Sequence, residues 1–161
     1  MSEFRKTLNY IKLKSKNEIS HLQKLLAKNR IIIVPLAQKM GGKSYYLQFF
    51  TRAVGEQLFT SIGVGDIFRR VKKQAETAKG RKRILKKLSE KFKNPEKELE
   101  TVLKSTSSSL VPDDLTFFLV ESELKSAKKS IILDGIPRSN NQLKYIKELE
   151  KETGMQVFLC Y

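Results

Sequence analysis

The sequence predicts an α/β fold in which helices flank a parallel sheet. Short apolar runs at residues 31–34 (IIIV), 130–134 (SIILD) and 156–160 (QVFLC) alternate with segments whose apolar residues recur at helical spacing. Continuous β-branched runs of this kind are typical of strands buried on both faces of a parallel sheet. The chain has 161 residues, of which 40% are hydrophobic and 30% charged, and this composition suits a globular domain.

The expected elements follow in chain order. Residues 1–30 form a basic N-terminal extension that contains a helix over 18–29, and residues 31–161 form the main domain. Strands are expected over 31–34, 58–62, 130–134 and 156–160. Helices are expected over 43–57, 112–124 and 140–152, and another helix is expected to begin at an N-cap at Asp66. Two or three short helices are expected within 71–104, with a break near Asn94–Pro95. Thr153–Gly154 ends the last helix. The final strand leaves an open sheet edge, which suggests a fragment or an abbreviated version of a longer fold.

Two segments carry the whole excess of positive charge. The chain has 32 Lys and Arg residues against 17 Asp and Glu residues, for a net charge of +15. Residues 1–30 have a net charge of +6, and residues 69–104 one of +9. A solvated helical face accounts for such charge, and phosphate contacts with a polyanion such as RNA are the alternative. Phe92 is the one aromatic residue of 69–104, so base stacking is not expected there.

The composition also excludes several classes of protein. No apolar run approaches the roughly 18 residues of a membrane span, and the N-terminus lacks a signal-peptide core. The single cysteine, Cys160, excludes an internal disulfide framework, and we expect it to be buried in its apolar strand. His21 is the one histidine, and we expect it at the surface, so no zinc or Cys-His arrangement is available. A cytoplasmic monomer without membrane contact is therefore expected.

The loop after the first strand, residues 37–44 (AQKMGGKS), contains most of a phosphate-binding pattern. Gly42, Lys43 and Ser44 fit the end of G-x-x-x-x-G-K-[ST], and Ala37 stands where the first glycine belongs. Backbone N–H groups in such a loop surround phosphate oxygens, and the following helix directs its positive end at them. A lysine-containing turn that opens a helix is the alternative.

The segment 61–70 (SIGVGDIFRR) contains glycines that allow close backbone approach, followed by charged side chains. Gly63 and Gly65 are these glycines, Asp66 can cap the next helix, and Arg69 lies about one turn into it. Taken alone, the segment is better explained as a capped turn with a surface arginine.

The segment 132–142 (ILDGIPRSNNQ) follows a buried strand. The strand brings Asp134 to its carboxyl end, and a turn through Gly135 and Pro137 then presents Arg138, a residue suited to bidentate phosphate recognition. The amides of Asn140, Asn141 and Gln142 can contact a base edge. The alternative is a strand–loop–helix connection capped by Ser139. A fourth segment, 110–120 (LVPDDLTFFLV), is by itself an amphipathic helix with Pro near its first turn.

In this order, the four segments resemble those of the adenylate kinase family of nucleoside monophosphate kinases. GGKS is similar to the family's phosphate loop, VGDIFR to T-G-D-[ML]-[LF]-R, LVPDDL to L-V-x-D-x-L, and LDGIPRSNNQ to D-G-[FY]-P-R-x-x-x-Q. The resemblance runs from about Ile31 to Tyr161. It makes residues 69–111 a long and basic insertion that binds the nucleoside monophosphate (NMP).

The resemblance implies transfer of the ATP γ-phosphoryl group to a nucleoside monophosphate, usually AMP, with Mg²⁺. It implies that Lys43 and Arg138 are catalytic and that Arg69 and Arg138 clamp the monophosphate. Asp134, with Asp66 as a weaker candidate, would orient Mg²⁺ through water, and Ser44 would be a hydroxyl ligand. The phosphate-binding residues would be Met40, Gly41, Gly42, Lys43, Ser44 and Tyr45, and the remaining NMP-binding residues Val64, Gly65, Val111, Gly135 and Gln142.

The sequence departs from the family pattern at several places. Ala37 replaces a glycine, Tyr45 a threonine and Val64 another threonine. The family's lid and its later catalytic arginines would follow Tyr161, so the resemblance implies poor turnover by these 161 residues. The alternative is a catalytically degenerate nucleotide-binding module that contacts RNA through its basic segments.

Overall fold

A four-stranded parallel sheet forms the centre of the computed structural model, which describes residues 16–36, 43–106 and 111–160, with the backbone alone at 25, 27, 43 and 44. The strands are β1 (Ile31–Pro35), β2 (Phe59–Gly63), β3 (Ser130–Asp134) and β4 (Gln156–Cys160), and their order across the sheet is β2-β3-β1-β4. Every neighbouring pair is parallel. The predicted α/β fold class is therefore confirmed, and so are the four strands.

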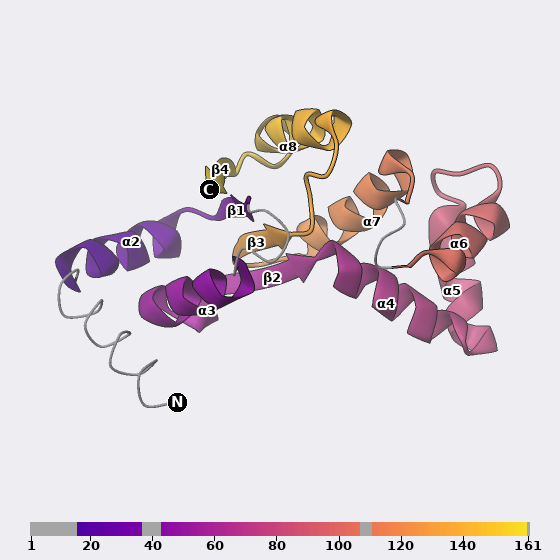
Figure 1. Ribbon diagram of the computed structural model, residues 1–161, viewed down its shortest axis with the longest axis horizontal. Coiled ribbons are helices and arrows are strands. Elements are labelled where there is room, and N and C mark those ends of the chain that lie inside the picture. The colour runs from indigo at the N-terminus through magenta and orange to yellow at the C-terminus, as the bar shows by residue number, and fades with distance from the viewer. Residues whose placement is uncertain (1–15, 37–42, 107–110, 161) are drawn as a thin grey trace.

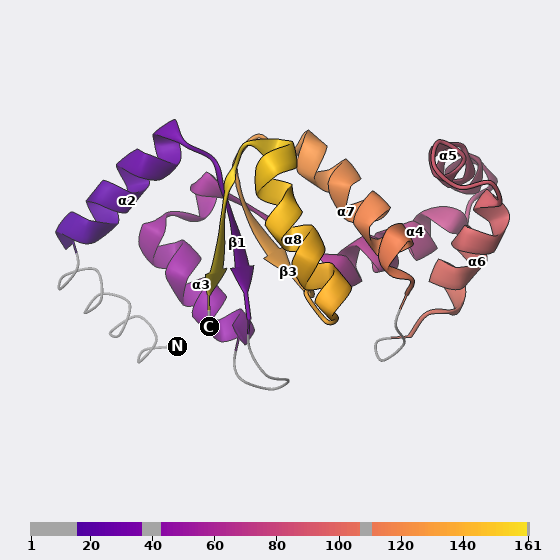
Figure 2. The same ribbon diagram turned by 90° about the horizontal axis from the view of Figure 1, so that it is seen from above.

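Helices cover both faces of this sheet. On one face, the helices α2 (Lys16–Lys28) and α3 (Lys43–Val54) contribute Leu26 and Val54 to a cluster with Ile33 and Ile132. On the other face, α7 (Asp113–Ser126) and α8 (Asn140–Thr153) pack on the strand residues of opposite parity, such as Ile32. Figure 2 shows the sheet between these two helix layers. The two apolar faces explain why the strands are continuous apolar runs.

Three further helices extend away from the sheet as an arm, defined here as residues 64–106 (Figure 1). They are α4 (Val64–Ala75), α5 (Ala78–Leu88) and α6 (Pro95–Lys104). The expected break near Asn94–Pro95 is confirmed, because the Asn94 side chain caps α6 and Pro95 occupies its first turn. A further break separates α4 from α5, where Thr77 caps the new helix.

Two helix boundaries differ from the expectation. The helix α4 begins at Val64 after Gly63, so Asp66 lies in its first turn and is not its N-cap. The helix α3 ends at Val54 because Gly55 has a φ of 128°, and a short 3₁₀ helix, η1 (Glu56–Leu58), fills the connection to β2. By contrast, Gly154 ends α8 at a φ of 65°, as the sequence predicts. Ser139 caps this helix, as in the alternative interpretation of segment 132–142.

The prediction that Cys160 is buried is wrong. Cys160 is exposed, and burial alternates along β4 because this strand lies at the edge of the sheet. Val157 and Leu159 pack against the core, whereas Gln156, Phe158 and Cys160 face outward, and Phe158 is 46% exposed. An apolar run therefore does not distinguish a central strand from an edge strand. Across the described ranges, no helix is long and apolar enough to cross a membrane.

Candidate functional site

The carboxyl ends of three strands meet at one edge of the sheet. Gly63 at the end of β2 is in register with Asp134 at the end of β3, and Ile33 of β1 is in register with Ile132 of β3. The chain leaves β1 toward α3 on one face and leaves β3 toward α8 on the other (Figure 2). Neighbouring strands whose connections diverge in this way form a topological switch point, where α/β proteins bind ligands.

The second and third sequence motifs are in contact at this edge. Gly135 has a φ of +94°, and a Cβ there would lie 3.3 Å from the Cβ of Val64 at the start of α4. A Cβ at Gly65 would lie 3.4 Å from the Nη1 atom of Arg69, so this arginine folds back over the same turn. Four of the predicted NMP-binding residues, Val64, Gly65, Arg69 and Gly135, thus lie next to one another, and Val64 is buried.

The loop after β3 holds Arg138 by its own backbone. The Nε atom of Arg138 donates to the carbonyl oxygen of Gly135 at 2.9 Å, and its backbone N–H donates to the Oε1 atom of Gln142 at 2.7 Å. The side chain is exposed, and its terminal guanidinium nitrogens make no hydrogen bond within the described part of the chain. Arg138 therefore presents its charge at the carboxyl edge of the sheet.

Asp113 connects the start of α7 to the start of α8. Its two carboxylate oxygens accept hydrogen bonds from the Nε2 atom of Gln142 at 2.7 Å and from the Oγ atom of Ser139 at 3.1 Å. Gln142 is only 3% exposed, and its backbone N–H donates to Ser139 Oγ at 3.1 Å. The fourth motif, with buried Val111 just before Asp113, is thereby joined to the third. The motif L-V-x-D-x-L includes Asp113 as its fixed acidic residue, but the sequence analysis assigned it no role, because an acidic residue in a first helical turn is an ordinary feature.

The phosphate-loop prediction lies mostly outside the described residues. Met40, Gly41 and Gly42 are among the residues that the structure does not describe, and so are the side chains of Lys43 and Ser44. The backbone of α3 begins at Lys43, and no acidic residue lies in its first turn. Tyr45 is 54% exposed, and its ring packs against Phe49 with the ring centroids 5.2 Å apart. The proximity of Lys43 to Arg138 therefore stays a prediction.

Asp134 lines a cavity of about 320 Å³ between α3 and the sheet, together with Ser61, Thr51 and Gln48. Glu56, which pairs with Arg52 at 3.2 Å, also lines this cavity, so two carboxylates lie beside hydroxyl and amide groups. This set suits Mg²⁺, which is usually held by one or two carboxylates, waters and substrate phosphates. Asp66 forms an ion pair with Arg69, and their side chains are 67% and 73% exposed, so Arg69 competes with any cation there. Within the described ranges, no group of three acidic, His or Cys ligands forms a metal cage.

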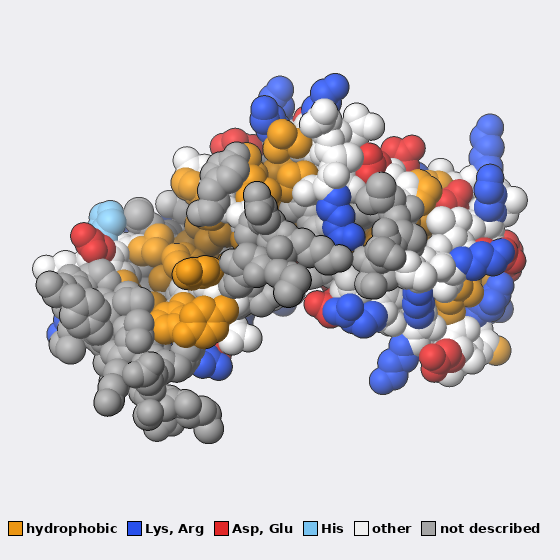
Figure 3. Space-filling model, in the orientation of Figure 1, with side chains coloured by type: hydrophobic (Ala, Val, Ile, Leu, Met, Phe, Trp, Pro, Cys, Tyr) orange, Lys and Arg blue, Asp and Glu red, His pale blue; other side chains and the backbone are white. Residues whose placement is uncertain are grey.

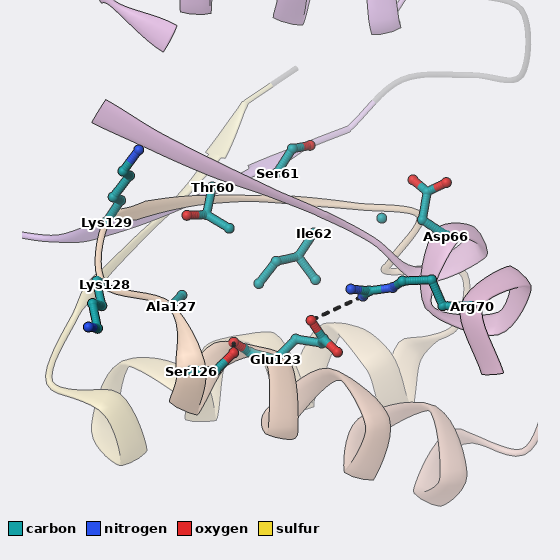
Figure 4. Close-up of a pocket in the computed structure, with 11 residues that line it drawn as sticks. Thr60, Ser61, Ile62, Asp66, Arg70, Glu123, Ser126, Ala127, Lys128 and Lys129 are labelled. Carbon is teal, nitrogen blue, oxygen red and sulfur yellow. Dashed lines mark hydrogen bonds and ion pairs between the residues drawn. The ribbon is translucent and has the colours of Figure 1, made fainter. Parts of the chain in front are cut away.

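A second cavity, of about 440 Å³, lies on the outer side of β2 (Figure 4). An ion pair between Arg70 of α4 and Glu123 of α7, at 3.0 Å, closes part of it, and Lys128 and Lys129 lie at the opposite end. None of the four motifs predicted this cavity. Two of the charged side chains that line it, Arg70 and Glu123, already pair with each other. Among its described lining residues, Asp66 is the one predicted site residue.

The fold and the site together define an α/β protein whose motif-bearing loops converge at the carboxyl edge of a parallel sheet. The chain is 34% identical to adenylate kinase of Fervidobacterium nodosum over 118 residues, which are 72% of this chain and 44% of that protein. It is 32% identical to adenylate kinase of Thermosipho melanesiensis over 127 residues, which are 78% of this chain and 49% of that protein. No family model matches the chain.

The chain is therefore a homologue of adenylate kinases over about three quarters of its length, and the resemblance carried by the four motifs is confirmed. It spans less than half the length of the curated relatives that it matches.

Proposed function

We propose that this chain acts in transfer of the γ-phosphoryl group of ATP to a nucleoside monophosphate, with AMP as the first candidate. The homology to adenylate kinases supports the class of enzyme. The observation that carries the proposal is the hydrogen-bonded network at the sheet edge, in which Arg138, Gln142 and Asp113 join two motifs that lie far apart in the sequence. Transfer of this kind depends on positioning and on neutralising charge, and such a network supplies positioning.

On the ATP side, Lys43 and the backbone N–H groups of residues 40–45 would bind the phosphates at the N-terminus of α3. Asp134, through water, and Ser44 would hold Mg²⁺, and Asp66 is the weaker candidate. When bound, Mg²⁺ would neutralise part of the negative charge that develops during phosphoryl transfer. The hydroxyl and amide groups of Ser61, Thr51 and Gln48, which line the cavity beside Asp134, favour this assignment.

On the monophosphate side, Arg69 and Arg138 would clamp the phosphate, and Val64, Gly65, Val111 and Gly135 would line the pocket for the nucleoside. Gln142 would contact the base. Among the described residues, its Oε1 atom accepts from Arg138 and one Nε2 proton goes to Asp113, so within this part of the chain the second N–H of the amide is left to donate to an acceptor on the base. The fixed orientation of this amide favours recognition of one base edge over others.

A coupled assay for ADP formation from ATP and AMP tests the proposal. Lys43→Ala and Arg138→Ala should each lower turnover by about three orders of magnitude or more, the scale expected when a charge that stabilises phosphoryl transfer is removed. Lys144→Ala, on the exposed surface of α8, is the matched control and should leave turnover unchanged. Undiminished activity in both site variants would refute the assignment.

Calorimetric titration with ATP, AMP and a bisubstrate dinucleotide separates binding from catalysis. Binding that Lys43→Ala and Arg138→Ala abolish, together with absent turnover, would identify the chain as a nucleotide-binding module. Absent binding of all three ligands would contradict both functions.

A further inference from the structure

Apart from Ala78 at its first position, the exposed residues of α5 are all cations. The four cations are Lys79, Lys82, Arg83 and Lys86. Lys82 and Arg83 each lie three or four residues from both Lys79 and Lys86, which brings the four side chains onto one side of the helix. All four are exposed, whereas Ile84 and Leu88 on the opposite side are buried in the arm. We call these four residues the α5 cationic face. Figure 3 shows Lys and Arg side chains projecting from this end of the molecule.

The acidic residues of the arm do not neutralise this face. Glu96 pairs with Arg81 at 2.8 Å and Glu100 with Lys104 at 2.9 Å, and Arg70 pairs with Glu123 at 3.0 Å. Glu76 and Glu90 lie just beyond the two ends of α5, and no ion pair joins either of them to the face within residues 64–106. Thermal adaptation would predict alternating charges in ion-pair networks, and the face has none. Four like charges side by side are unfavourable for the isolated helix, so an anionic partner would stabilise it.

The surroundings of the face favour a nucleic acid over a membrane. The exposed large hydrophobic side chains of the described residues are Tyr45, Tyr46 and Phe158, and all of them lie outside the arm. A helix that binds a membrane surface needs an apolar side to insert, and the apolar side of α5 is buried. Phe92 packs on Phe118 with ring centroids 5.5 Å apart, so it does not offer a free ring for base stacking.

The dimensions of the face also match a phosphate backbone. From Lys79 to Lys86 the helix rises by roughly 10 Å. Phosphates on each strand of a duplex recur about every 3.4 Å along its axis, so the face spans about three phosphates of one strand. Four flexible cations at this spacing can neutralise phosphates while reading no bases.

We propose that the α5 cationic face binds the phosphate backbone of a nucleic-acid duplex without base specificity. This function is separate from phosphoryl transfer, because none of the four residues belongs to the nucleotide site proposed above. Binding through about three to four phosphate contacts depends steeply on salt, since each contact releases condensed counterions.

Fluorescence anisotropy with labelled RNA and DNA duplexes of mixed sequence tests the proposal. The affinity of the wild-type chain should fall about 100-fold between about 50 and about 200 mM salt. The variant K79Q/K82Q/R83Q/K86Q should lose most of its binding at low salt. The control K125Q/K144Q/K147Q/K151Q removes the same charge from exposed positions of α7 and α8, and it should bind like the wild type. Circular dichroism checks that each variant keeps its helices.

Several outcomes would overturn the proposal. Equal loss of affinity in the two variants would show that binding depends on net charge alone. Retained binding in the α5 variant would show that the α5 cationic face is not the binding site. Affinity that does not change with salt, or absent binding of both duplexes at low salt, would exclude backbone recognition. Binding to anionic lipid vesicles without binding to either duplex would assign the face to a membrane instead.

Discussion

At the scale of single residues, Asp113 links the start of α7 to the start of α8. It accepts hydrogen bonds from Ser139 and Gln142 across 26 and 29 residues of sequence. Removing the carboxylate leaves the partly buried donors without an acceptor, which costs about 1–3 kcal/mol of folding free energy.

We therefore expect Asp113→Ala to lower the free energy of unfolding, measured by urea titration, by that amount. Asp114→Ala is the matched control, because Asp114 is an exposed neighbour in the same helical turn. The same loss in both variants would show that the network contributes nothing beyond the charge at the start of α7.

Two glycines with positive φ give a second residue-scale prediction. Gly154 has a φ of +65° and open space around it, whereas at Gly135 a φ of +94° combines with the close approach to Val64. Gly154→Ala should cost about 1 kcal/mol, the strain of a left-handed alanine. Gly135→Ala should cost more, because the new methyl group also displaces the start of α4. Urea unfolding measures both, and a smaller loss for Gly135→Ala would contradict this account.

At the scale of elements, the N-cap of α6 contributes to the stability of the arm, and this contribution can be tested by itself. The Oδ1 atom of Asn94 accepts from the backbone N–H of Lys97 at 3.2 Å, and α6 then buries Leu99 and Val102. Asn94→Ala should lower the free energy of unfolding by about 1 kcal/mol, and Asn94→Ser, which keeps an acceptor, should lose less. Equal unfolding midpoints for the two variants would argue against a capping role.

Elements with local causes could be predicted from the sequence. The apolar run of β1, the Asn94–Pro95 break, the Ser139 cap and the Gly154 stop depend on neighbouring residues alone. Features that depend on tertiary neighbours could not. Cys160 is exposed because β4 is at the edge of the sheet, and the sequence of residues 156–160 does not show the position of β4 in the sheet.

The candidate site also combines features that the local sequence predicts with features that it does not. The motifs located Arg138 and Gln142, because turn and amide residues follow a buried strand. The orientation of Gln142 depends on Asp113, whose partners cannot be read from local sequence.

At the scale of the whole molecule, charge is distributed unevenly between the sheet region and the arm. Of the net charge of +15, residues 69–104 carry +9. Self-repulsion among like charges destabilises the folded state, and salt screens it within about 10 Å at 0.1 M.

The unfolding temperature should therefore rise as potassium chloride is added from low ionic strength. The variant K79Q/K82Q/R83Q/K86Q has less repulsion, so its unfolding temperature should rise less under the same conditions. A wild-type unfolding temperature that falls as salt is added would contradict this expectation.

The arm leaves the sheet after β2 and returns through α7 to β3, and β2 and β3 are adjacent strands. The two connecting helices, α4 and α7, contact each other and share the Arg70–Glu123 ion pair. Since entry and exit are side by side, a segment of different length or composition can be spliced in between them at little entropic cost to the central domain. Chimaeras that exchange this segment among homologues can thus transplant its properties while the strand order stays as it is.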